Sequence, residues 1–527
     1  MKRFIQRAVV LCAIIIFFAA VAAFVLPLIF AFIPTASASS AKAISLKQLC
    51  KVSLFTLLQA TLSAFIALAV GLCAAYFVSH KNFAFRKILA ATSAVPLSIP
   101  PLIIALGYVG FFGMNGGLNR AFSALFHTDK KLVTFLYSFK GIIIAQGFYN
   151  FPLVMSTIAD TWAHLLKEQS EAAEILGASK LRIFFTITLH QLSSCIISSL
   201  IPVFLYCFFS FLIVLLFGGV GTSTLEVELY QAARSSLDMS SASSIALTET
   251  LIAIAFVFLY SSFERKIAGK KAEISALEQK RVRITGVERA VAFPFFLLII
   301  LFFASPLFCI AFSAFPHFSL SVVKKIIASK GFRTALVHTI QTGIMTSFFC
   351  VVVAFVYAVF LRIASKKDST LLKTLPILPM AVSSVVMGFG ITRAVQNGTV
   401  ALLIASQTAL IFPLAFRQLW ASIEKISSEA LDVAAMLSPH KTDTIFYIYL
   451  KSSKRAIISS FILCFASSAG DTTLPLVLAI PHYDTLALYT YRLASSYRYA
   501  QASASGLLLG ILCIALFALG NFIKEKK

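Results

Sequence analysis

Long apolar segments alternate with short polar ones along almost the whole chain. A helix needs about 20 apolar residues to cross the hydrocarbon core of a bilayer. About twelve windows qualify: 8–33, 52–78, 88–112, 133–161, 192–218, 242–263, 290–314, 334–361, 371–395, 399–421, 453–479 and 499–523. These runs are too long for the strands of about 9–11 residues that build membrane barrels. The pattern predicts an all-α integral membrane protein with about 12 transmembrane helices.

Composition supports a membrane protein over a soluble one. Hydrophobic residues make up 59% of the chain and charged residues 13%, against about 25% charged residues in a soluble domain. The net charge of +24 would suggest a nucleic-acid partner in a soluble protein. Here the lysines and arginines cluster beside the ends of apolar segments, as they do in the cytoplasmic loops of membrane proteins. Nucleic-acid binding is therefore not expected.

The basic clusters also predict the orientation of the chain in the membrane. With a cytoplasmic N-terminus every second loop is cytoplasmic, and these loops hold nearly all of the clusters; they are 79–87, 162–191, 264–289, 362–370 and 422–452. The first apolar run is longer than the roughly 7–15 residues of a signal-peptide core, which indicates a retained helix. The terminal lysines from Lys524 onward predict a cytoplasmic C-terminus as well.

The sequence contains an internal repeat. The segment 53–59 resembles 335–341, and Phe151-Pro152 recurs as Phe412-Pro413, where the position numbers differ by 412 − 151 = 261. Because six is an even number of spans, both units would have the same orientation. The repeat predicts two parallel six-helix units, residues 1–265 and 290–527, joined by a basic cytoplasmic linker at 266–289.

The cytoplasmic loop 171–190 carries the strongest functional signal. A short helix is followed by a glycine able to adopt a left-handed turn and by a second helix that rises toward the membrane. Small alanines allow close approach of another protein, and the glutamate offers a carboxylate to a partner's arginine or lysine. An interfacial helix pair with no partner is the alternative. The candidate docking residues are Glu171, Ala172, Ala173 and Gly177.

A degenerate copy of this loop occupies 432–451, at the same offset as the Phe-Pro pairs, since 432 − 171 = 261. Its candidate docking residues are Asp432, Ala434 and Ser438. Aspartate replaces the glutamate and serine replaces the glycine, so the two loops are not expected to be equivalent.

Prolines, glycines and polar residues inside the apolar windows are candidates for a translocation pathway. Proline and glycine free backbone groups, which a membrane tolerates only beside protein or a water-filled cavity. An intramembrane carboxylate costs roughly 2.5–3.5 kcal/mol and usually faces the interior of a bundle. Packing kinks, a structural ion pair, a helix-terminal acid at the outer interface or an interhelical hydrogen bond are the alternatives. The candidates are Asn150, Pro152, Pro413, Gly470 and Asp471.

The first of the two loops resembles a known signature. EAA, three residues, G, nine residues and I-x-L is the loop of the inner-membrane permease subunits of binding-protein-dependent ABC importers. The spacing matches fully, with His190 in place of the usual proline. The likeness extends over nearly the whole chain and is greatest for fused double permeases of the thiamine type, with the ferric-iron type next.

This resemblance implies the passive membrane subunit of an ATP-driven importer in the cytoplasmic (inner) membrane. Two copies of a cytoplasmic ABC ATPase are expected to dock on 171–190 and 432–451, and an extracytoplasmic binding protein to deliver a small solute. Thiamine leads among the solutes, with ferric iron, polyamines and oxyanions as alternatives.

The chain itself is not expected to be an enzyme or to hold a cofactor. It has no GxxxxGK[ST] loop, so ATP and magnesium are expected on the partner ATPase. The cysteines form no CxxC pair and no Cys/His cluster with metal-ligand spacing. A secondary transporter with two parallel halves is a second interpretation of the sequence. Such a transporter needs no ATPase, and paired intramembrane acids or bases would indicate it. A membrane-embedded enzyme is a third, for which no catalytic constellation is visible.

Overall fold

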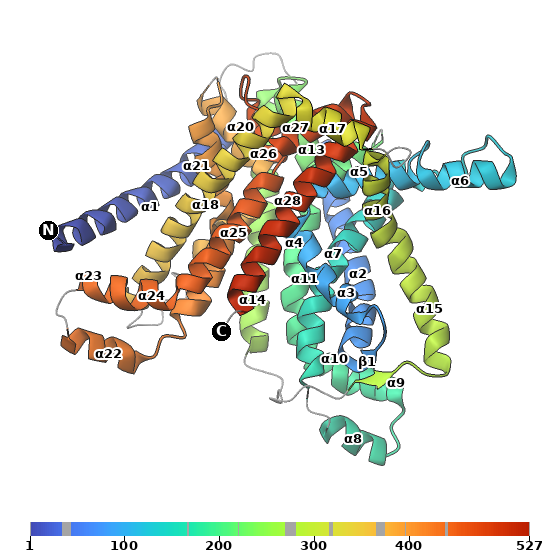
Figure 1. Ribbon diagram of the computed structural model, residues 1–527, viewed down its shortest axis with the longest axis horizontal. Coiled ribbons are helices and arrows are strands. Elements are labelled where there is room, and N and C mark those ends of the chain that lie inside the picture. The colour runs from blue at the N-terminus through green and yellow to red at the C-terminus, as the bar shows by residue number, and fades with distance from the viewer. Residues whose placement is uncertain are drawn as a thin grey trace.

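The computed structural model describes residues 2–33, 44–165, 168–219, 221–268, 281–315, 320–364, 375–395, 397–437 and 441–525. Over these residues the chain is almost entirely helical (Figure 1). Nine of the described helices are long and apolar enough to cross a membrane, or ten if one bent pair counts as a span. The prediction of an all-α membrane protein is confirmed.

The helices of the first half are α1 (Lys2–Phe32), α2 (Leu46–His80), α3 (Arg86–Ala91), η1 (Thr92–Ala94), α4 (Val95–Ser98), α5 (Pro101–Phe112), α6 (Gly117–Phe126), η2 (Phe135–Tyr137), α7 (Phe139–Ala163), α8 (Glu168–Ile175), α9 (Lys180–Ile183), η3 (Phe184–Thr188), α10 (Leu189–Gln191), α11 (Ser193–Phe208), α12 (Phe211–Phe217), α13 (Leu225–Arg234) and α14 (Met239–Ala268).

Those of the second half are α15 (Val287–Ile299), η4 (Ile300–Ala304), α16 (Ser305–Ala314), α17 (Ser321–Ala328), α18 (Lys330–Ala364), η6 (Leu375–Ala381), α20 (Ser384–Ala394), α21 (Val400–Ile423), α22 (Ser428–Leu437), α23 (Lys441–Thr444), η7 (Ile445–Tyr449), α24 (Leu450–Ser452), α25 (Lys454–Gly470), α26 (Thr473–Leu478), α27 (Leu486–Ser495) and α28 (Tyr499–Glu525).

The helix boundaries repeat with the offset of the Phe-Pro pairs. Helices α7 and α21 begin at positions 139 and 400, and α11 and α25 begin at positions 193 and 454, so both pairs keep that offset. The loops 171–190 and 432–451 each contain a π-helix, η3 and η7, and these begin at the equivalent positions 184 and 445. The division into 1–265, 266–289 and 290–527 stays a prediction, and positions 269–280 of the linker lie outside the described residues.

Four of the predicted windows, 88–112, 192–218, 371–395 and 453–479, are broken rather than continuous helices. Helix α4 is separated from α5, α11 from α12, η6 from α20, and α25 from α26 by short non-helical segments. At two of these breaks a polar side chain caps the next helix: Ser383 accepts a hydrogen bond from Val386 N at 3.1 Å, and Asp471 accepts one from Thr473 N at 3.0 Å. Such breaks are tolerated at membrane depth where protein surrounds them.

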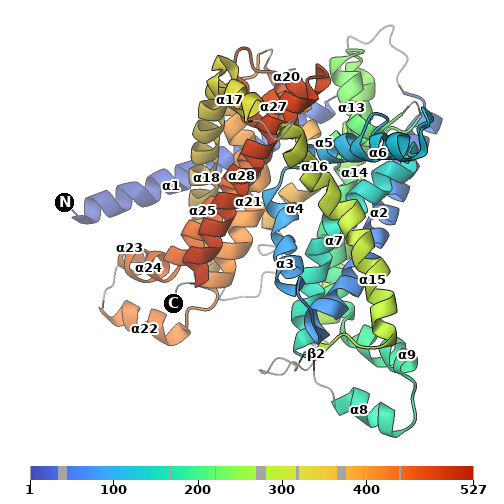
Figure 2. The same ribbon diagram turned by 45° about the vertical axis from the view of Figure 1, so that its right-hand side comes forward.

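The leading helix of each half packs against the opposite half. Helix α1 lies against α20, α18 and α21, whereas α16 lies against α5 and α28. The contacts are close at two glycines: a Cβ on Gly390 would overlap the backbone oxygen of Pro27, and one on Gly107 would overlap that of Pro306. Because the leading helix of each half contacts the other half, an exchange of leading helices, the two halves form one bundle (Figures 1 and 2).

We expect Gly390→Ala and Gly107→Ala to destabilise the bundle, because the new methyl group meets backbone atoms that cannot rotate away. Overpacking of this kind costs about 1–3 kcal/mol. Thermal unfolding in detergent, followed with a thiol-reactive dye on the buried cysteines, measures the effect. Gly510→Ala is the matched control, since only Ile103 Cδ1 lies within 4 Å of the added atom, at 3.5 Å. An unchanged melting temperature for Gly390→Ala would contradict the close packing.

A short parallel ladder ties the end of the linker to the first half. Strands β1 (Lys81–Asn82) and β2 (Val282–Arg283) pair in register. Lys81 Nζ lies 2.6 Å from Glu288 Oε1, and the lysine side chain is only 11% exposed. Burial acts to lower the pKa of Lys81, but its contacts with Glu288 and Tyr76 outweigh that effect, so the pKa is raised. The ladder and the ion pair hold the second half against the first.

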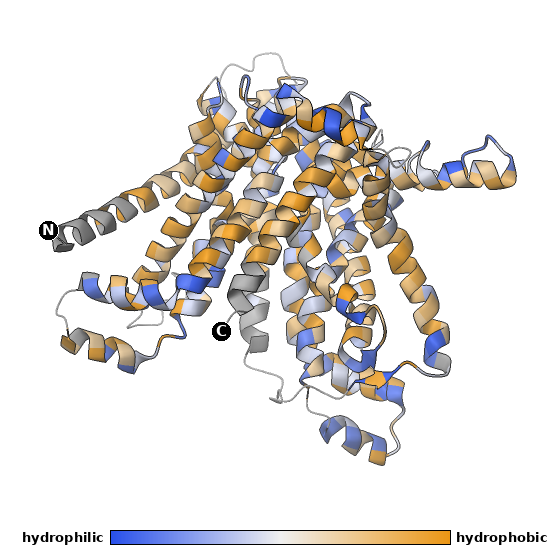
Figure 3. Cartoon of the chain, viewed as in Figure 1, coloured by the Kyte–Doolittle hydropathy of each residue, from blue (hydrophilic) through white to orange (hydrophobic). Residues whose placement is uncertain are grey.

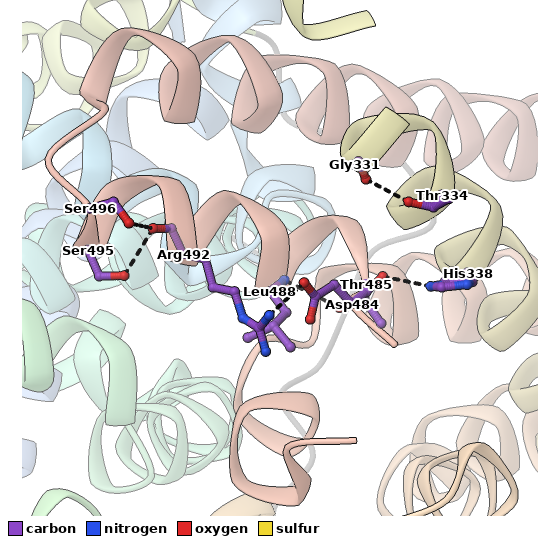
Figure 4. Close-up of polar contacts among 9 residues, drawn as sticks. All are labelled: Gly331, Thr334, His338, Asp484, Thr485, Leu488, Arg492, Ser495 and Ser496. Atoms are coloured by element: carbon purple, nitrogen blue, oxygen red, sulfur yellow. Dashed lines mark hydrogen bonds and ion pairs between the residues drawn. The ribbon is translucent and has the colours of Figure 1, made fainter. Parts of the chain in front are cut away.

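Polar residues gather at the two ends of the bundle, and apolar residues follow the long helices between them (Figure 3). The short helices α8 and α22 lie on opposite sides of the bundle at one of its ends, and α13 and α27 lie at the other end (Figure 1). At this second end α27 is fixed to α18: Asp484 forms an ion pair with Arg492 at 2.8 Å, and the Asp484 carbonyl lies 3.1 Å from His338 Nδ1 (Figure 4). Long helices thus separate two polar surfaces.

Candidate functional site

A cavity of about 380 Å³ lies between the two halves. Its walls come from α4, α5, α7, α11, α12 and α13 of the first half and from η6, α20, α21, α25 and α26 of the second, so the broken helices contribute much of its lining. Four of the five predicted pathway residues line this cavity: Asn150, Pro413, Gly470 and Asp471. Pro152 is buried in α7 outside the lining.

Two glutamines, Gln146 and Gln407, occupy equivalent positions of the repeat in the cavity wall. Gln407 has its hydrogen bonds satisfied: its Oε1 accepts from Ser468 at 2.7 Å and from Thr346 at 3.2 Å. Gln146 is only 1% exposed, yet neither its Oε1 nor its Nε2 has a hydrogen-bond partner. The wall from the first half therefore has an amide group without hydrogen-bond partners, whereas the equivalent amide in the wall from the second half belongs to a closed network, in which every member is hydrogen-bonded.

Asp471 belongs to the closed network. Its Oδ2 accepts a hydrogen bond from Gln407 Nε2 at 3.0 Å, and its Oδ1 accepts from the backbone N–H groups of Thr473 at 3.0 Å and Leu474 at 3.3 Å. An aspartate is well suited to this position because its carboxylate satisfies free N–H groups at the start of a helix. The structure thus gives Asp471 the role of fixing α26 as well as a place in the cavity wall.

We expect Asp471→Asn to lower solute uptake about tenfold while leaving the chain correctly inserted. The amide has a single acceptor oxygen, so it must turn its NH2 group toward either the Gln407 amide or the α26 backbone and lose hydrogen bonds worth about 1–3 kcal/mol. Uptake into membrane vesicles and yield of purified protein measure the two effects. Asp484→Asn, which changes a surface ion pair, is the control; equal uptake by both variants would leave Asp471 without a role in transport.

The loop 171–190 of the first half begins with a helix that has a well-defined end. Gly177 has a φ of +82°, Gly177 N donates to Glu174 O at 2.9 Å, and Ala178 N donates to Ala173 O at 3.0 Å. This is the hydrogen-bond pattern of a Schellman motif, which requires a left-handed residue such as glycine. Glu171 and Ala172 are exposed beside it, and Glu171 also lines a pocket of about 820 Å³ between α8 and the bundle.

The loop 432–451 of the second half presents a similar helix. In α22, Asp432 is exposed and Ala434 is half-buried. Ser438, the equivalent of Gly177, lies outside the described residues. The prediction of a degenerate turn at this position therefore stays a prediction.

Each of the two short helices ends in a pair of exposed apolar side chains. Ile175 and Leu176 are 86% and 87% exposed, and Met436 and Leu437 are 86% and 82% exposed. The two pairs occupy equivalent positions of the repeat, since 436 − 175 = 261. Exposed apolar groups rimmed by polar residues are typical of a surface that another protein covers. The geometry therefore suits the docking of one partner on each loop.

Several residues of the site were not singled out from the sequence. Gln146 and Gln407 are visible there only as a pair at the repeat offset, and Glu249 only as a lone acid inside the window 242–263. Glu226 falls in a loop between predicted spans, and its place in the cavity wall depends on how α13 packs. Over the described residues, histidine, cysteine and acidic side chains form no group that could hold a metal ion.

Comparison with known proteins adds a family likeness. Residues 67–269 match the family of binding-protein-dependent transport system inner membrane components. The thiamine transport system permease protein ThiP of Brucella abortus is 24% identical over 489 residues, which cover 89% of this chain and 87% of the relative. ThiP of Escherichia coli K12 is 22% identical over 475 residues, which cover 88% of this chain and 87% of the relative. A putative 2-aminoethylphosphonate transport system permease protein, PhnU of Salmonella typhi, is 32% identical over 164 residues, which cover 31% of this chain and 57% of the relative.

Proposed function

We propose that this chain, which carries a membrane-component domain of binding-protein-dependent transport systems in residues 67–269, is the fused permease of an ABC importer for thiamine. It is a transport subunit rather than an enzyme, and it resides in the inner membrane. Both of its halves contribute to one pathway, and the cavity between them is the part of that pathway captured in this conformation.

The observation that carries the proposal is the matched pair of exposed apolar helix ends on α8 and α22. Each offers a separate ATPase subunit an apolar contact next to a carboxylate, Glu171 in one loop and Asp432 in the other. Two copies of the ATPase bind, one to each loop, and their ATP-driven closure moves the halves of the bundle against each other. ATP and magnesium are held by that partner.

The orientation follows from the same docking surfaces. The end of the bundle with α8 and α22 faces the cytoplasm, together with both termini. The opposite end, with α13 and α27, receives an extracytoplasmic binding protein. The basic loops lie on the cytoplasmic side, as the distribution of lysine and arginine in membrane proteins requires.

Thiamine is the proposed solute because relatives that match over nearly the full length of the chain are thiamine permeases. The shorter likeness to a 2-aminoethylphosphonate permease covers one part of the chain only. Ferric iron, polyamines and oxyanions are the other solutes that the assay must include.

A proton-driven secondary transporter is the second candidate, because the structure contains two adjacent buried acids, Glu226 and Glu249, as such transporters do. Purification of the tagged chain from its own membranes in mild detergent separates the two. We expect an ATPase to co-purify in a 2:1 ratio and to hydrolyse ATP in the complex. Transport by the chain alone, driven by a proton gradient, would favour the second candidate.

A further inference from the structure

Two glutamates from the first half are buried against each other beside the central cavity. Glu226 of α13 is 1% exposed and Glu249 of α14 is completely buried. Their carboxyl groups lie close to each other and to the hydroxyl of Ser383, the residue that precedes α20 of the second half. Glu226 Oε2 and both carboxyl oxygens of Glu249 have no hydrogen-bond partner.

Neither glutamate has a positively charged neighbour in the part of the chain that the structure describes. The ion pairs there involve Glu288 and Asp484 instead. A buried carboxylate without a counter-ion is costly, and two adjacent carboxylates repel each other. The two carboxyl groups therefore have no neutralising cation beside them, although the chain as a whole carries a net charge of +24.

Glu226 borders the cavity, because it forms part of its wall. The same wall contains Gln146, with both amide atoms unpaired, and Asn150, whose Oδ1 is unpaired. Both of these side chains come from α7, a different helix, and both are almost completely buried, with 1% and 2% exposed. Buried polar groups are normally hydrogen-bonded, so this side of the cavity is built to receive a polar ligand.

The rest of the lining indicates the charge of that ligand. Lysine, arginine and histidine are absent from the lining residues that the structure describes, whereas the carboxylates of Glu226 and Asp471 are present. Four aromatic side chains also border the cavity: Tyr149, Tyr206, Phe209 and Phe211. Aromatic faces attract cations through the negative charge of the ring face. An organic cation with a flat ring fits these walls, and an anion does not.

We propose that Glu226 is the cation-binding residue of this cavity. Glu249, buried behind it, is a positioning residue whose carboxyl group adds to the negative charge that a bound cation neutralises. Gln146 and Asn150 supply the hydrogen bonds that orient the bound organic cation. The inference deepens the proposed function, on which it rests: it names the charge class of the transported solute and the residue that selects it.

The test measures ligand-dependent thermal stability of the purified full-length chain in detergent. A thiol-reactive dye reports unfolding, since Cys207, Cys350, Cys464 and Cys513 are buried in the folded state. The probes are thiamine, the polyamine spermidine and the anion sulfate. We expect thiamine to raise the melting temperature of the wild type, and Glu226→Gln to weaken thiamine binding at least about tenfold, as the loss of a charge-assisted hydrogen bond implies.

Glu228→Gln is the matched control, because Glu228 lies on the same helix but borders a different, outer pocket; it should bind thiamine as the wild type does. If Glu226→Gln is not obtained folded, Glu226→Asp retains the charge and should bind with reduced affinity. Wild-type stabilisation by spermidine and not thiamine would support the cation site and contradict the thiamine assignment. Stabilisation by sulfate alone, no stabilisation by any probe, or full thiamine binding by Glu226→Gln would overturn the inference.

Discussion

The double substitution Ile175→Gln/Leu176→Gln is expected to abolish co-purification of the ATPase. Glutamine forms helices as well as these residues do, so α8 is preserved while its exposed apolar surface is removed. Covering one such side chain contributes about 1.5–3 kcal/mol, and losing two therefore weakens the complex by about 100-fold or more. Quantitative pull-down of the ATPase by the tagged chain measures the change.

The second loop provides an internal comparison, and the far end of the bundle provides a control. Met436→Gln/Leu437→Gln removes the equivalent pair from α22 and should also weaken the complex. Tyr497→Gln changes an exposed aromatic side chain between α27 and α28, on the surface opposite the docking loops, and should have no effect. Normal ATPase recovery with both double variants would remove the docking assignment.

The second large effect is expected at Gly177, where proline should eliminate ATP-driven uptake in a chain that still inserts. Proline fixes φ at about −65°, against +82° at this position, and removes the N–H that bonds to Glu174 O at 2.9 Å. The exposed pair at the end of α8 then loses its orientation. ATP hydrolysis and uptake, measured on the same preparation, reveal whether the two are uncoupled.

Gly177→Asn is the matched control, because asparagine adopts left-handed backbone conformations more readily than other side chains and keeps the N–H. We expect it to retain most of the uptake. If Gly177→Pro transports as well as Gly177→Asn does, the turn does not transmit the motion of the ATPase.

Much of the architecture could be predicted because it depends on local patterns. Apolar length indicates a membrane span, and the glycine at 177 indicates a left-handed turn; the structure has α2, α7 and that turn at the expected places. The repeat offset, seen first in the two Phe-Pro pairs, recurs in the boundaries of the later helices of each half.

The breaks in the helices and the exchange of α1 and α16 were not predictable in the same way. A hydropathy window averages over Ser210 and Asp471, so it reads a broken pair such as α25 and α26 as one span. The exchange depends on close contacts between distant segments, such as Pro27 with Gly390, which no local pattern contains.

The central cavity was likewise predictable only in part from the sequence. Four of the five pathway candidates line it, because proline, glycine and polar residues inside spans mark places where a membrane helix needs protein around it. The sequence does not reveal that Asp471 has its hydrogen bonds satisfied while Gln146 does not. Only the packing of α13 and α14 brings Glu226 and Glu249 together.

Uptake of labelled thiamine by proteoliposomes tests the account most directly. The vesicles contain the full-length chain with its co-purified ATPase, ATP inside and the binding protein outside. The account predicts thiamine accumulation that requires ATP and the binding protein and that ceases with Gly177→Pro. Accumulation without ATP, or ATP-driven uptake of an oxyanion in place of thiamine, would contradict it.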